Sequence, residues 1–413
     1  MASMAPVWND SCSIAPLAFR TTSTMSEQKS ERFPYLDSVR GIAAILVVIH
    51  HSGLGFAEGF MKVHGHLSSA HSLSGIFWYA CVMFMSFGRS AVLTFFVLSG
   101  FVLTHSITNN PTSYPIYAIR RFFRIYPAYL VVILASFAIH TYIDGPQTST
   151  ILLSHLDMDG TKNAIHLDLA AWSLDHEMRI SLFFPVLVWL VSRFRGKFVF
   201  ASFAISLSCT LTLLRITGHV AEGFGESNFW PTWLDTGFFV FFFSLGSIVA
   251  LELPSVADYF THLSHSKTIL AIGLFFICMV IGDHGSTSPY SSAIDYIRGF
   301  GAAGIIGLTA GCPKLAGALG YAGFRWLGRI SYSLYLVHMP LIYVVTHTFG
   351  RNWAPIPAGL FAIGISLLSA MLVSSIVEFP CMRLGKAIAR YLSPIRRSGR
   401  LGNESLVVRP PSL

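Results

Sequence analysis

Stretches of about 20 mostly apolar residues recur along this chain, and their length constrains its fold more than any other feature. An apolar helix of that length crosses the hydrocarbon core of a bilayer while satisfying its backbone hydrogen bonds internally. Only 12% of the 413 residues are charged, whereas a soluble domain has about 25%. The sequence therefore predicts an all-α, polytopic membrane protein that contacts the lipid bilayer.

Hydropathy predicts about ten transmembrane helices. By residue number they cover 37–56, 91–107, 125–143, 171–191, 198–217, 233–251, 267–282, 294–312, 327–347 and 357–377. The apolar stretch 75–88 is shorter, and we expect an interfacial or re-entrant segment there. If that stretch also spans the membrane, the number of spans rises by one.

Lysine and arginine are distributed unevenly between the loops. With a cytosolic N-terminus, 19 of the 28 basic residues lie on the cytosolic side, 6 lie on the opposite side and 3 lie within or at the ends of helices. Short cytosolic loops carry the excess of positive charge in membrane proteins. We therefore predict that both termini are cytosolic, in an endomembrane or the plasma membrane. The net charge of +8 comes from these short clusters and does not indicate a nucleic-acid partner.

Two polar segments flank the predicted membrane-embedded domain, which covers residues 36–390. Residues 1–35 lack the apolar core of a signal peptide, and we expect a disordered extension there. Residues 391–413 are predicted to form a basic tail near anionic lipid. The six cysteines are scattered without a C-x-x-C pair, so we expect no metal site; the H-x-H at His64 and His66 is a weak signal.

Arg40 and His51 belong to one apolar stretch, V-R-G-I-A-A-I-L-V-V-I-H-H. Ionisable side chains are costly in hydrocarbon, so their presence indicates function. A step of eleven residues at 100° each leaves the two side chains about 20° apart around the helix and roughly 16 Å apart along its axis. His50 lies about 100° round the helix from His51. The pattern predicts a substrate track along the face that Arg40 and His51 share.

Glu177 lies near the start of the fourth span, in A-A-W-S-L-D-H-E-M-R. On a helix that runs inward it lies about 9 Å below the outer surface, and His51, on a helix that runs outward, lies about 21 Å from the inner surface. In a core of about 30 Å the two are at matching depth. We predict that Glu177 orients His51 as a general base. The alternative is a structural ion pair that locks two helices.

Arg121 and Arg124 lie one turn apart in the segment I-R-R-F-F-R-I-Y-P. Guanidinium groups match the oxygens of a phosphate, so one interpretation is a cytosolic phosphate clamp that Arg40 completes. Coenzyme A, which is rich in phosphates and confined to the cytosol, would fit such a cluster. The alternative, given equal weight, is that these arginines only anchor the helix at the cytosolic surface.

Four further positions are candidates for supporting roles. His338 lies in the middle of the ninth span, where a histidine is more often a hydrogen-bonded packing residue than a catalyst. A backbone amide or hydroxyl near Ser99 and Gly100 is a candidate for stabilising an oxyanion. Ser99 and Ser331 are candidates for carrying a covalent acyl intermediate, as is histidine.

Six strings of this sequence together resemble the acyltransferase-3 family of integral-membrane O-acyltransferases. They are Y-L-D-S-V-R-G-I-A-A-I-L-V-V-I-H-H, F-F-V-L-S-G-F-V-L, R-R-F-F-R-I-Y-P, W-S-L-D-H-E, L-G-R-I-S-Y-S-L-Y-L-V-H-M-P and E-F-P, in the family's order from residue 35 to about 380. One string alone is weakly specific, whereas six in order are a strong match. The resemblance implies about ten helices and transfer of an acetyl or other acyl group from cytosolic acyl-CoA to a hydroxyl.

The resemblance also assigns roles to individual positions. The family's arginine and histidine pair falls on Arg40 and His51, its R-x-x-R falls on Arg121 and Arg124, and its glutamate falls on Glu177. Acetyl-CoA or another acyl-CoA would then be a co-substrate, and no permanently bound cofactor is expected.

The end of the chain bears on the acceptor. After the ninth span only one more helix and a basic tail follow, without the extracytoplasmic hydrolase-like domain of bacterial cell-wall members. We therefore favour a hydroxylated, small lipophilic natural product over a cell-surface polysaccharide or other glycan. A proton-coupled transporter is the rival from another class, since it also buries histidine, glutamate and arginine, but the chain shows no repeated halves.

Overall fold

The structure is a computed structural model, and it describes residues 33–64, 87–158, 166–218, 229–281, 290–349, 353 and 355–392. The chain divides into two units, Met1–Phe33 and Pro34–Leu413, and the description below concerns the second. Most of the predicted N-terminal extension, nearly all of the predicted C-terminal tail and the stretch 75–88 up to residue 86 lie outside the described residues.

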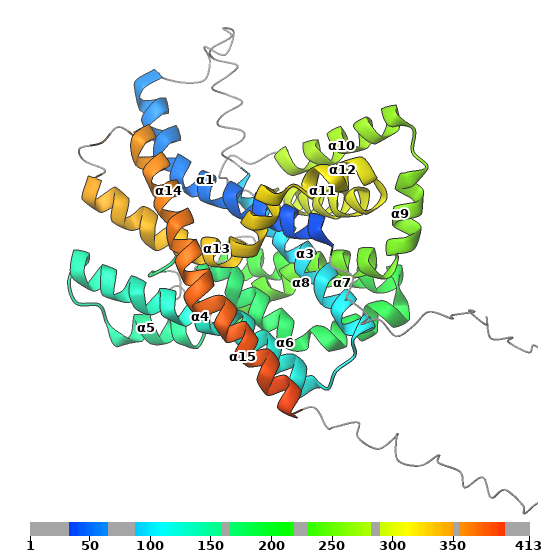
Figure 1. The fold of residues 1–413 in the computed structure, drawn as a ribbon, viewed down its shortest axis with the longest axis horizontal. Coiled ribbons are helices and arrows are strands. Elements are labelled where there is room, and N and C mark those ends of the chain that lie inside the picture. Colours follow the sequence, from blue (N-terminus) through cyan, green and yellow to red (C-terminus); the bar gives the residue numbers. More distant parts are fainter. Residues whose placement is uncertain are drawn as a thin grey trace, which may run out of the picture. The chain divides into compact units, whose positions relative to one another are not determined.

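Every regular element in the described ranges is a helix, which confirms the predicted all-α class (Figure 1). The helices are α1 (Pro34–His64), α3 (Gly88–Asn109), α4 (Tyr114–Asp144), α5 (Ser149–Leu156), α6 (Ala171–Phe194), α7 (Gly196–Thr217), α8 (Phe229–Leu251), α9 (Leu253–Thr261), α10 (His265–Val280), α11 (Ser291–Gly311), α12 (Pro313–Leu319), α13 (Ala322–Phe349), α14 (Pro355–Val373), the π-helical turn η3 (Ser374–Glu378) and α15 (Phe379–Leu392).

In the described residues, each of the ten apolar stretches predicted from the sequence lies almost entirely on helices, but their number as membrane spans is not supported. Within the described residues, five helices are long and apolar enough to cross a bilayer, and a sixth span results if the bent pair α11 and α12 counts as one. Two examples show why the others fall short. The first half of α6 carries Asp175, Glu177 and Arg179, and the apolar helix α10 has only 16 residues.

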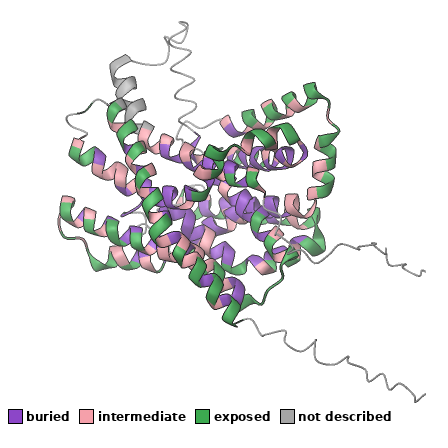
Figure 2. Ribbon diagram, viewed as in Figure 1, coloured by how far each residue is buried: buried purple, intermediate pink, exposed green. Residues whose placement is uncertain are grey.

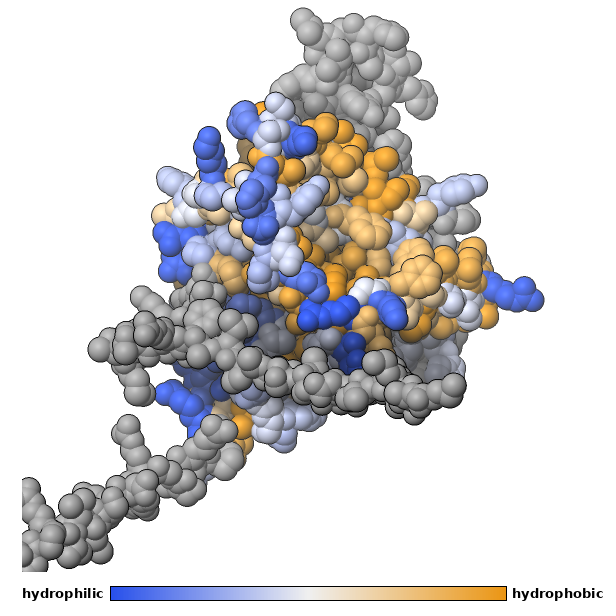
Figure 3. Space-filling model, turned by 90° about the vertical axis from the view of Figure 1, so that its right-hand side faces the viewer, coloured by the Kyte–Doolittle hydropathy of each residue, from blue (hydrophilic) through white to orange (hydrophobic). Residues whose placement is uncertain are grey.

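The exposed surface of the helical unit is typical of a membrane protein. Large apolar side chains are exposed along α7, α10 and α14, among them Phe200, Leu270 and Leu360. Figure 3 shows hydrophobic residues spread over much of one side of the molecule. Water-soluble proteins rarely expose contiguous apolar areas of that kind, so we assign this surface to lipid.

The buried core gathers around α3 and α8, where Figure 2 shows the densest group of buried residues. Two glycines allow these helices to approach closely. A Cβ atom on Gly100 would lie 2.1 Å from the carbonyl oxygen of Phe243, and one on Gly246 would lie 1.9 Å from that of Val97. Small residues at such crossings replace side-chain bulk by backbone contact, as is common between membrane helices.

Helices α1 and α13 form another close crossing. A Cβ atom on Gly328 would lie 2.0 Å from the carbonyl oxygen of Asp37, and one on Gly41 would lie 2.5 Å from the backbone nitrogen of Gly328. The crossing fixes the distance between the two helices that carry the predicted Arg40–His51 track and His338. In Figure 1, α14 and α15 (orange to red) form one long rod, and α15 passes beside α4.

Candidate active site

A polar cavity lies between α1, α3, α4, α6 and α13, and it contains about 790 Å³ of space, its mouth included. Its polar lining comes from Arg40, Ser99, Arg121, Arg124, Ser173, Glu177, Ser331, Tyr332 and Tyr335. Its apolar lining comes from Val92, Phe95, Phe96, Val102, Leu103, Ile125 and Leu174. The fold therefore brings Arg40, Arg121, Arg124 and Glu177, predicted as one site, to a single cavity.

Glu177 is held by two donors on neighbouring helices. Ser99 Oγ and Arg121 Nη2 each donate to Glu177 Oε1 at 3.0 Å. Arg121 Nη2 also donates to Ser181 Oγ at 2.6 Å, one turn further along α6. The carboxylate and the guanidinium are 19% and 14% exposed, so they form a charge-assisted pair inside the cavity wall. Glu177 consequently positions Arg121.

Arg124 has a different acidic partner. Its Nη1 donates to Glu378 Oε1 at 2.6 Å, and Ser333 Oγ donates to Glu378 Oε2 at 2.6 Å. The guanidinium also lies over the ring of Tyr332, 5.6 Å from its centroid. Glu378 is fully buried at the end of the π-helical turn η3, a type of distortion that often marks functional sites.

Arg40 completes the cationic part of the cavity. It lines the cavity, and within the described residues no acidic side chain forms an ion pair with it. Arg121 and Arg124 are paired with Glu177 and Glu378. The five ionic groups thus leave one net positive charge, so an anionic group of a ligand is favoured at Arg40.

His51 pairs with His338 across the α1–α13 crossing. His51 Nδ1 lies 3.0 Å from His338 Nε2, and His338 Nδ1 lies 2.6 Å from the carbonyl oxygen of Tyr335. Because a carbonyl oxygen only accepts, His338 Nδ1 carries the hydrogen, and a neutral His338 then accepts at Nε2. His51 must therefore donate from Nδ1, which leaves its Nε2 lone pair available to a hydroxyl. The hydrogen-bond network assigns these tautomers.

The structure corrects the predicted contact between His51 and Glu177. In the described residues each has other partners, His338 for His51 and the pair Ser99 and Arg121 for Glu177. The histidine pair lies next to the cavity rather than in its lining. Tyr335 connects them, because it lines the cavity and its ring centroid is 5.5 Å from that of His338.

The supporting positions divide between the cavity wall and the packing. Ser99 and Ser331 line the cavity, and Ser331 Oγ donates to the Gly328 carbonyl oxygen at 2.8 Å. Gly100 lies inside α3, where a helix uses its backbone N–H groups internally, and it faces the Phe243 backbone. The Gly100 amide is therefore already used within the helix, and Gly100 is a packing residue; stabilisation of an oxyanion by a hydroxyl near Ser99 stays a prediction. His338 has the hydrogen bonds expected of a packing residue, but its partner is the predicted base.

Two residues of the site are absent from the candidates that the sequence analysis names. Glu378 has a signal in the sequence, since an acidic residue beside an apolar stretch, V-E-F-P, indicates function. Tyr335 gave no separate signal. In the part of the chain that the structure describes, no group of three or more His, Cys, Asp or Glu residues could hold a metal ion. The H-x-H of His64 and His66 lies outside the described side chains.

Comparison with known proteins adds the family. The acyltransferase-3 family model, an acyltransferase domain, matches residues 33–375. The chain is 26% identical to the acyltransferase MdmB of Streptomyces mycarofaciens, over 72% of this chain and 81% of that protein. It is 25% identical to the O-acetyltransferase OatA of Staphylococcus aureus, over 91% of this chain. The match covers 61% of the length of OatA. No solved structure matches the chain.

Proposed function

The chain belongs to the acyltransferase-3 family, and from that premise we propose that it moves an acetyl or other short acyl group from acyl-CoA to a hydroxyl of a small lipophilic acceptor. The observation that carries the proposal is one cavity that combines Arg40, the paired arginines and Glu177, with the His51–His338 pair beside it. Family membership favours an enzyme over the proton-coupled transporter, since the buried charges then serve acyl transfer.

The donor is proposed from the charges of the cavity. Arg40 supplies an uncompensated cation, and Glu177 and Glu378 hold Arg121 and Arg124 in fixed positions. Guanidinium groups bind phosphate oxygens in a fork geometry, which suits the diphosphate of coenzyme A. His51 lies roughly 16 Å further along α1 than Arg40, so the acyl group reaches it only on an extended arm. A thioester donor has such an arm.

The acceptor is proposed from the apolar part of the lining. Seven aliphatic or aromatic residues, including Phe95, Phe96 and Leu103, line the cavity beside its polar groups. An apolar ligand body favours such walls, because apolar surface leaves water when it binds. A small lipophilic alcohol therefore fits better than a polysaccharide, which remains the second candidate.

In the proposed reaction, His51 acts as a general base. Its Nε2 takes the proton of the acceptor hydroxyl as the hydroxyl oxygen attacks the thioester carbonyl carbon. The tetrahedral intermediate then collapses, the carbon–sulfur bond breaks, and the imidazolium returns the proton to the departing thiolate. His338 holds the Nδ1–H of His51 throughout, so that the lone pair of Nε2 points to the hydroxyl. The products are the ester and free coenzyme A.

The orientation in the membrane follows from the same cavity. Coenzyme A is cytosolic, so we infer that the end of the molecule with Arg40, Arg121 and Arg124 faces the cytosol. The predicted excess of basic residues in the loops on that side supports this orientation, with both termini cytosolic.

Release of coenzyme A tests the proposed function. Purified, detergent-solubilised protein is given acetyl-CoA and a panel of hydroxylated lipophilic compounds and glycans, and free thiol is measured. An O-acyltransferase releases coenzyme A only when a suitable acceptor is present. Absence of both release and acetyl-CoA binding across the panel would contradict the proposal and return attention to transport.

A further inference from the structure

A second cavity opens beside Arg124, away from the histidine pair. It is lined by Ser106, Arg120, Arg124, Met382, Lys386 and Arg390, and it contains about 1,090 Å³ of space, its mouth included. Four of these six residues are cations and none is acidic. We refer to it as the outer basic cleft. Neither the proposed reaction nor the predicted arginine clamp accounts for Lys386 and Arg390.

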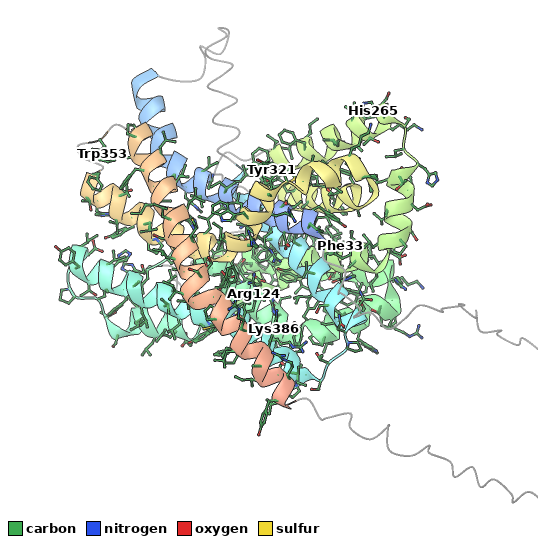
Figure 4. All side chains as sticks on the ribbon, in the orientation of Figure 1. Phe33, Arg124, His265, Tyr321, Trp353 and Lys386 are labelled. Carbon is green, nitrogen blue, oxygen red and sulfur yellow. The ribbon has the colours of Figure 1, made fainter. Side chains whose placement is uncertain are left out.

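Two helices bring these cations together. Arg120 and Arg124 are four residues apart on α4, and Lys386 and Arg390 are four residues apart on α15, so each pair shares a helix face. Figure 4 shows Lys386 on α15 near Arg124 on α4. The helices pack closely, because a Cβ atom on Gly385 would lie 2.5 Å from Cβ of Phe123.

Most of this positive charge is uncompensated. Arg124 is paired with Glu378, but Arg120, Lys386 and Arg390 form no ion pair within the described residues. Arg390 Nε donates only to the Lys386 carbonyl oxygen, at 3.4 Å. Three like charges around one cleft repel one another, and a multiply charged anion relieves that repulsion.

The polar cavity of the candidate active site, called the inner cavity below, and the outer basic cleft have one lining residue in common. Arg124 lines both, so a ligand can extend from one to the other past its guanidinium. The inner cavity has one net positive charge, whereas the outer cleft has three cations beyond the neutralised Arg124. The most highly charged end of a bridging ligand therefore belongs in the outer cleft.

We propose that the outer basic cleft binds the 3′-phosphate of the acyl-CoA donor, while the rest of the donor extends past Arg124 toward Arg40. This assignment rests on the proposed function. A phosphate monoester carries about −1.5 to −2 charges at pH 7 and three acceptor oxygens, which suits Arg120, Lys386 and Arg390. The site thus selects coenzyme A over carriers that lack this phosphate.

The same chemistry has a second possible source. An anionic lipid headgroup also presents a phosphate, and basic helices at the cytosolic surface attract such lipids. The two sources predict different binding behaviour of the cleft. A donor site distinguishes nucleotides by their 3′-phosphate, whereas a lipid site responds to the composition of the bilayer.

The test compares acetyl-CoA with acetyl-dephospho-CoA, which lacks only the 3′-phosphate. The wild type and the double variant Lys386→Ala/Arg390→Ala are placed in nanodiscs of neutral lipid, with Arg383→Ala, an exposed residue of α15 outside the cleft, as the control. We expect kcat/KM of the wild type and of the control to favour acetyl-CoA by about 10- to 100-fold, as for hydrogen bonds to charged groups. The double variant loses that preference.

Binding of adenosine 3′,5′-bisphosphate and of adenosine 5′-diphosphate, measured by calorimetry, gives a readout that does not depend on turnover. The wild type should bind the 3′,5′-bisphosphate more tightly, and the double variant should bind both equally. Equal binding by the wild type, or an unchanged preference in the double variant, overturns the assignment, and acyl transfer from acetyl-CoA then still stands. An effect of the double variant seen only with added phosphatidylserine also overturns it and assigns the cleft to lipid.

Discussion

His51 Nδ1 on α1 lies 3.0 Å from His338 Nε2 on α13, at the most extensive helix crossing of the described structure. The direction of this hydrogen bond follows from the Tyr335 carbonyl oxygen, which accepts from His338 Nδ1. One backbone carbonyl therefore determines that Nδ1 of His51 carries the hydrogen and that Nε2 keeps its lone pair. The proposed reaction depends on this relay of two hydrogen bonds, from His51 Nδ1 to His338 and from His338 Nδ1 to the Tyr335 carbonyl oxygen.

Replacement of His338 tests the relay. His338→Phe removes the acceptor for the Nδ1–H of His51, so the imidazole loses its orientation, and kcat should fall by about 10²-fold with KM for acetyl-CoA little changed. His338→Gln retains a side-chain carbonyl oxygen and should restore part of the rate. Steady-state kinetics decide the matter, and equal rates for the wild type and both variants would show that His338 only packs.

Arg40 is expected to act on the donor rather than on the chemical step. Arg40→Ala removes the uncompensated cation of the inner cavity, so KM for acetyl-CoA should rise by about 10- to 100-fold, the range for a hydrogen bond to a charged group. Arg40→Lys keeps the charge but lacks the planar guanidinium, so its KM for acetyl-CoA should lie between those of the wild type and of Arg40→Ala. If kcat of Arg40→Ala changes and KM does not, the diphosphate of the donor does not bind at Arg40.

Glu378 and Glu252 allow the contribution of a buried ion pair to stability to be compared with that of an exposed one. Glu378 is fully buried against Arg124, whereas Glu252 pairs with Arg195 at 2.9 Å with about half of each side chain exposed. Removing one partner of a buried pair costs about 3–5 kcal/mol, and an exposed pair contributes about 0–1 kcal/mol. Thermal denaturation in detergent should therefore show a much lower Tm for Glu378→Ala than for Glu252→Ala. Similar Tm values would contradict the buried ion pair.

The close crossing of α1 and α13 leads to a test at Gly328. A methyl group there would meet the Asp37 carbonyl oxygen, so Gly328→Ala must separate the helices and lengthen the contact between His51 and His338. We expect loss of activity together with a lower Tm. Gly273→Ala on α10 is the control, because a methyl group there would meet nothing within 4 Å, and alanine in an open helical site stabilises by about 0.5–1 kcal/mol. Full activity of Gly328→Ala would disprove the close crossing.

Asp168, just before α6, predicts a dependence of stability on pH. Burial raises the pKa of its carboxyl to about 7, against roughly 3.9 in an unfolded chain. The folded state therefore binds more protons than the unfolded state between about pH 4 and pH 7, and stability falls as pH rises through that window. Asp168→Asn keeps an oxygen for the Ala170 N–H and should remove this fall.

The measurement for Asp168 is Tm in detergent from about pH 4 to pH 8, a range that covers this window and extends past its upper end. Asp258→Asn, at an exposed position of α9, is the control and should follow the wild type. A wild-type Tm that does not fall relative to Asp168→Asn as pH rises would show that the carboxyl is ionised in the folded state.

The sequence predicted the helical class and the members of the cavity better than it predicted their pairing. Spacing along one helix places Arg40 and His51 on one face, and the cost of buried charge singles out Glu177. Depth in the membrane is only a one-dimensional coordinate, however. Depth places Glu177 level with His51, but it does not determine which helix lies beside α1. Tertiary packing places α13 there.

Two other differences have equally local causes. The π-helical turn η3 ends at the buried Glu378, and periodicity at 3.6 residues per turn does not anticipate such a turn. Gly100 was a candidate for a site near an oxyanion, yet its amide lies inside the continuous helix α3, and the residue serves the contact with α8. Glycine in a membrane helix is thus better interpreted as a site of close packing.

The most direct test of the proposed reaction follows labelled acetyl groups from acetyl-CoA to an acceptor in the wild type, His51→Ala and His50→Ala. Loss of a general base costs about 10²- to 10⁴-fold in rate, and His50, one residue away on another face of α1, is the matched control. We predict labelled ester from the wild type and from His50→Ala, and a loss of that size in His51→Ala. Wild-type transfer by His51→Ala, with His50→Ala inactive, would contradict the assignment of His51 as the base.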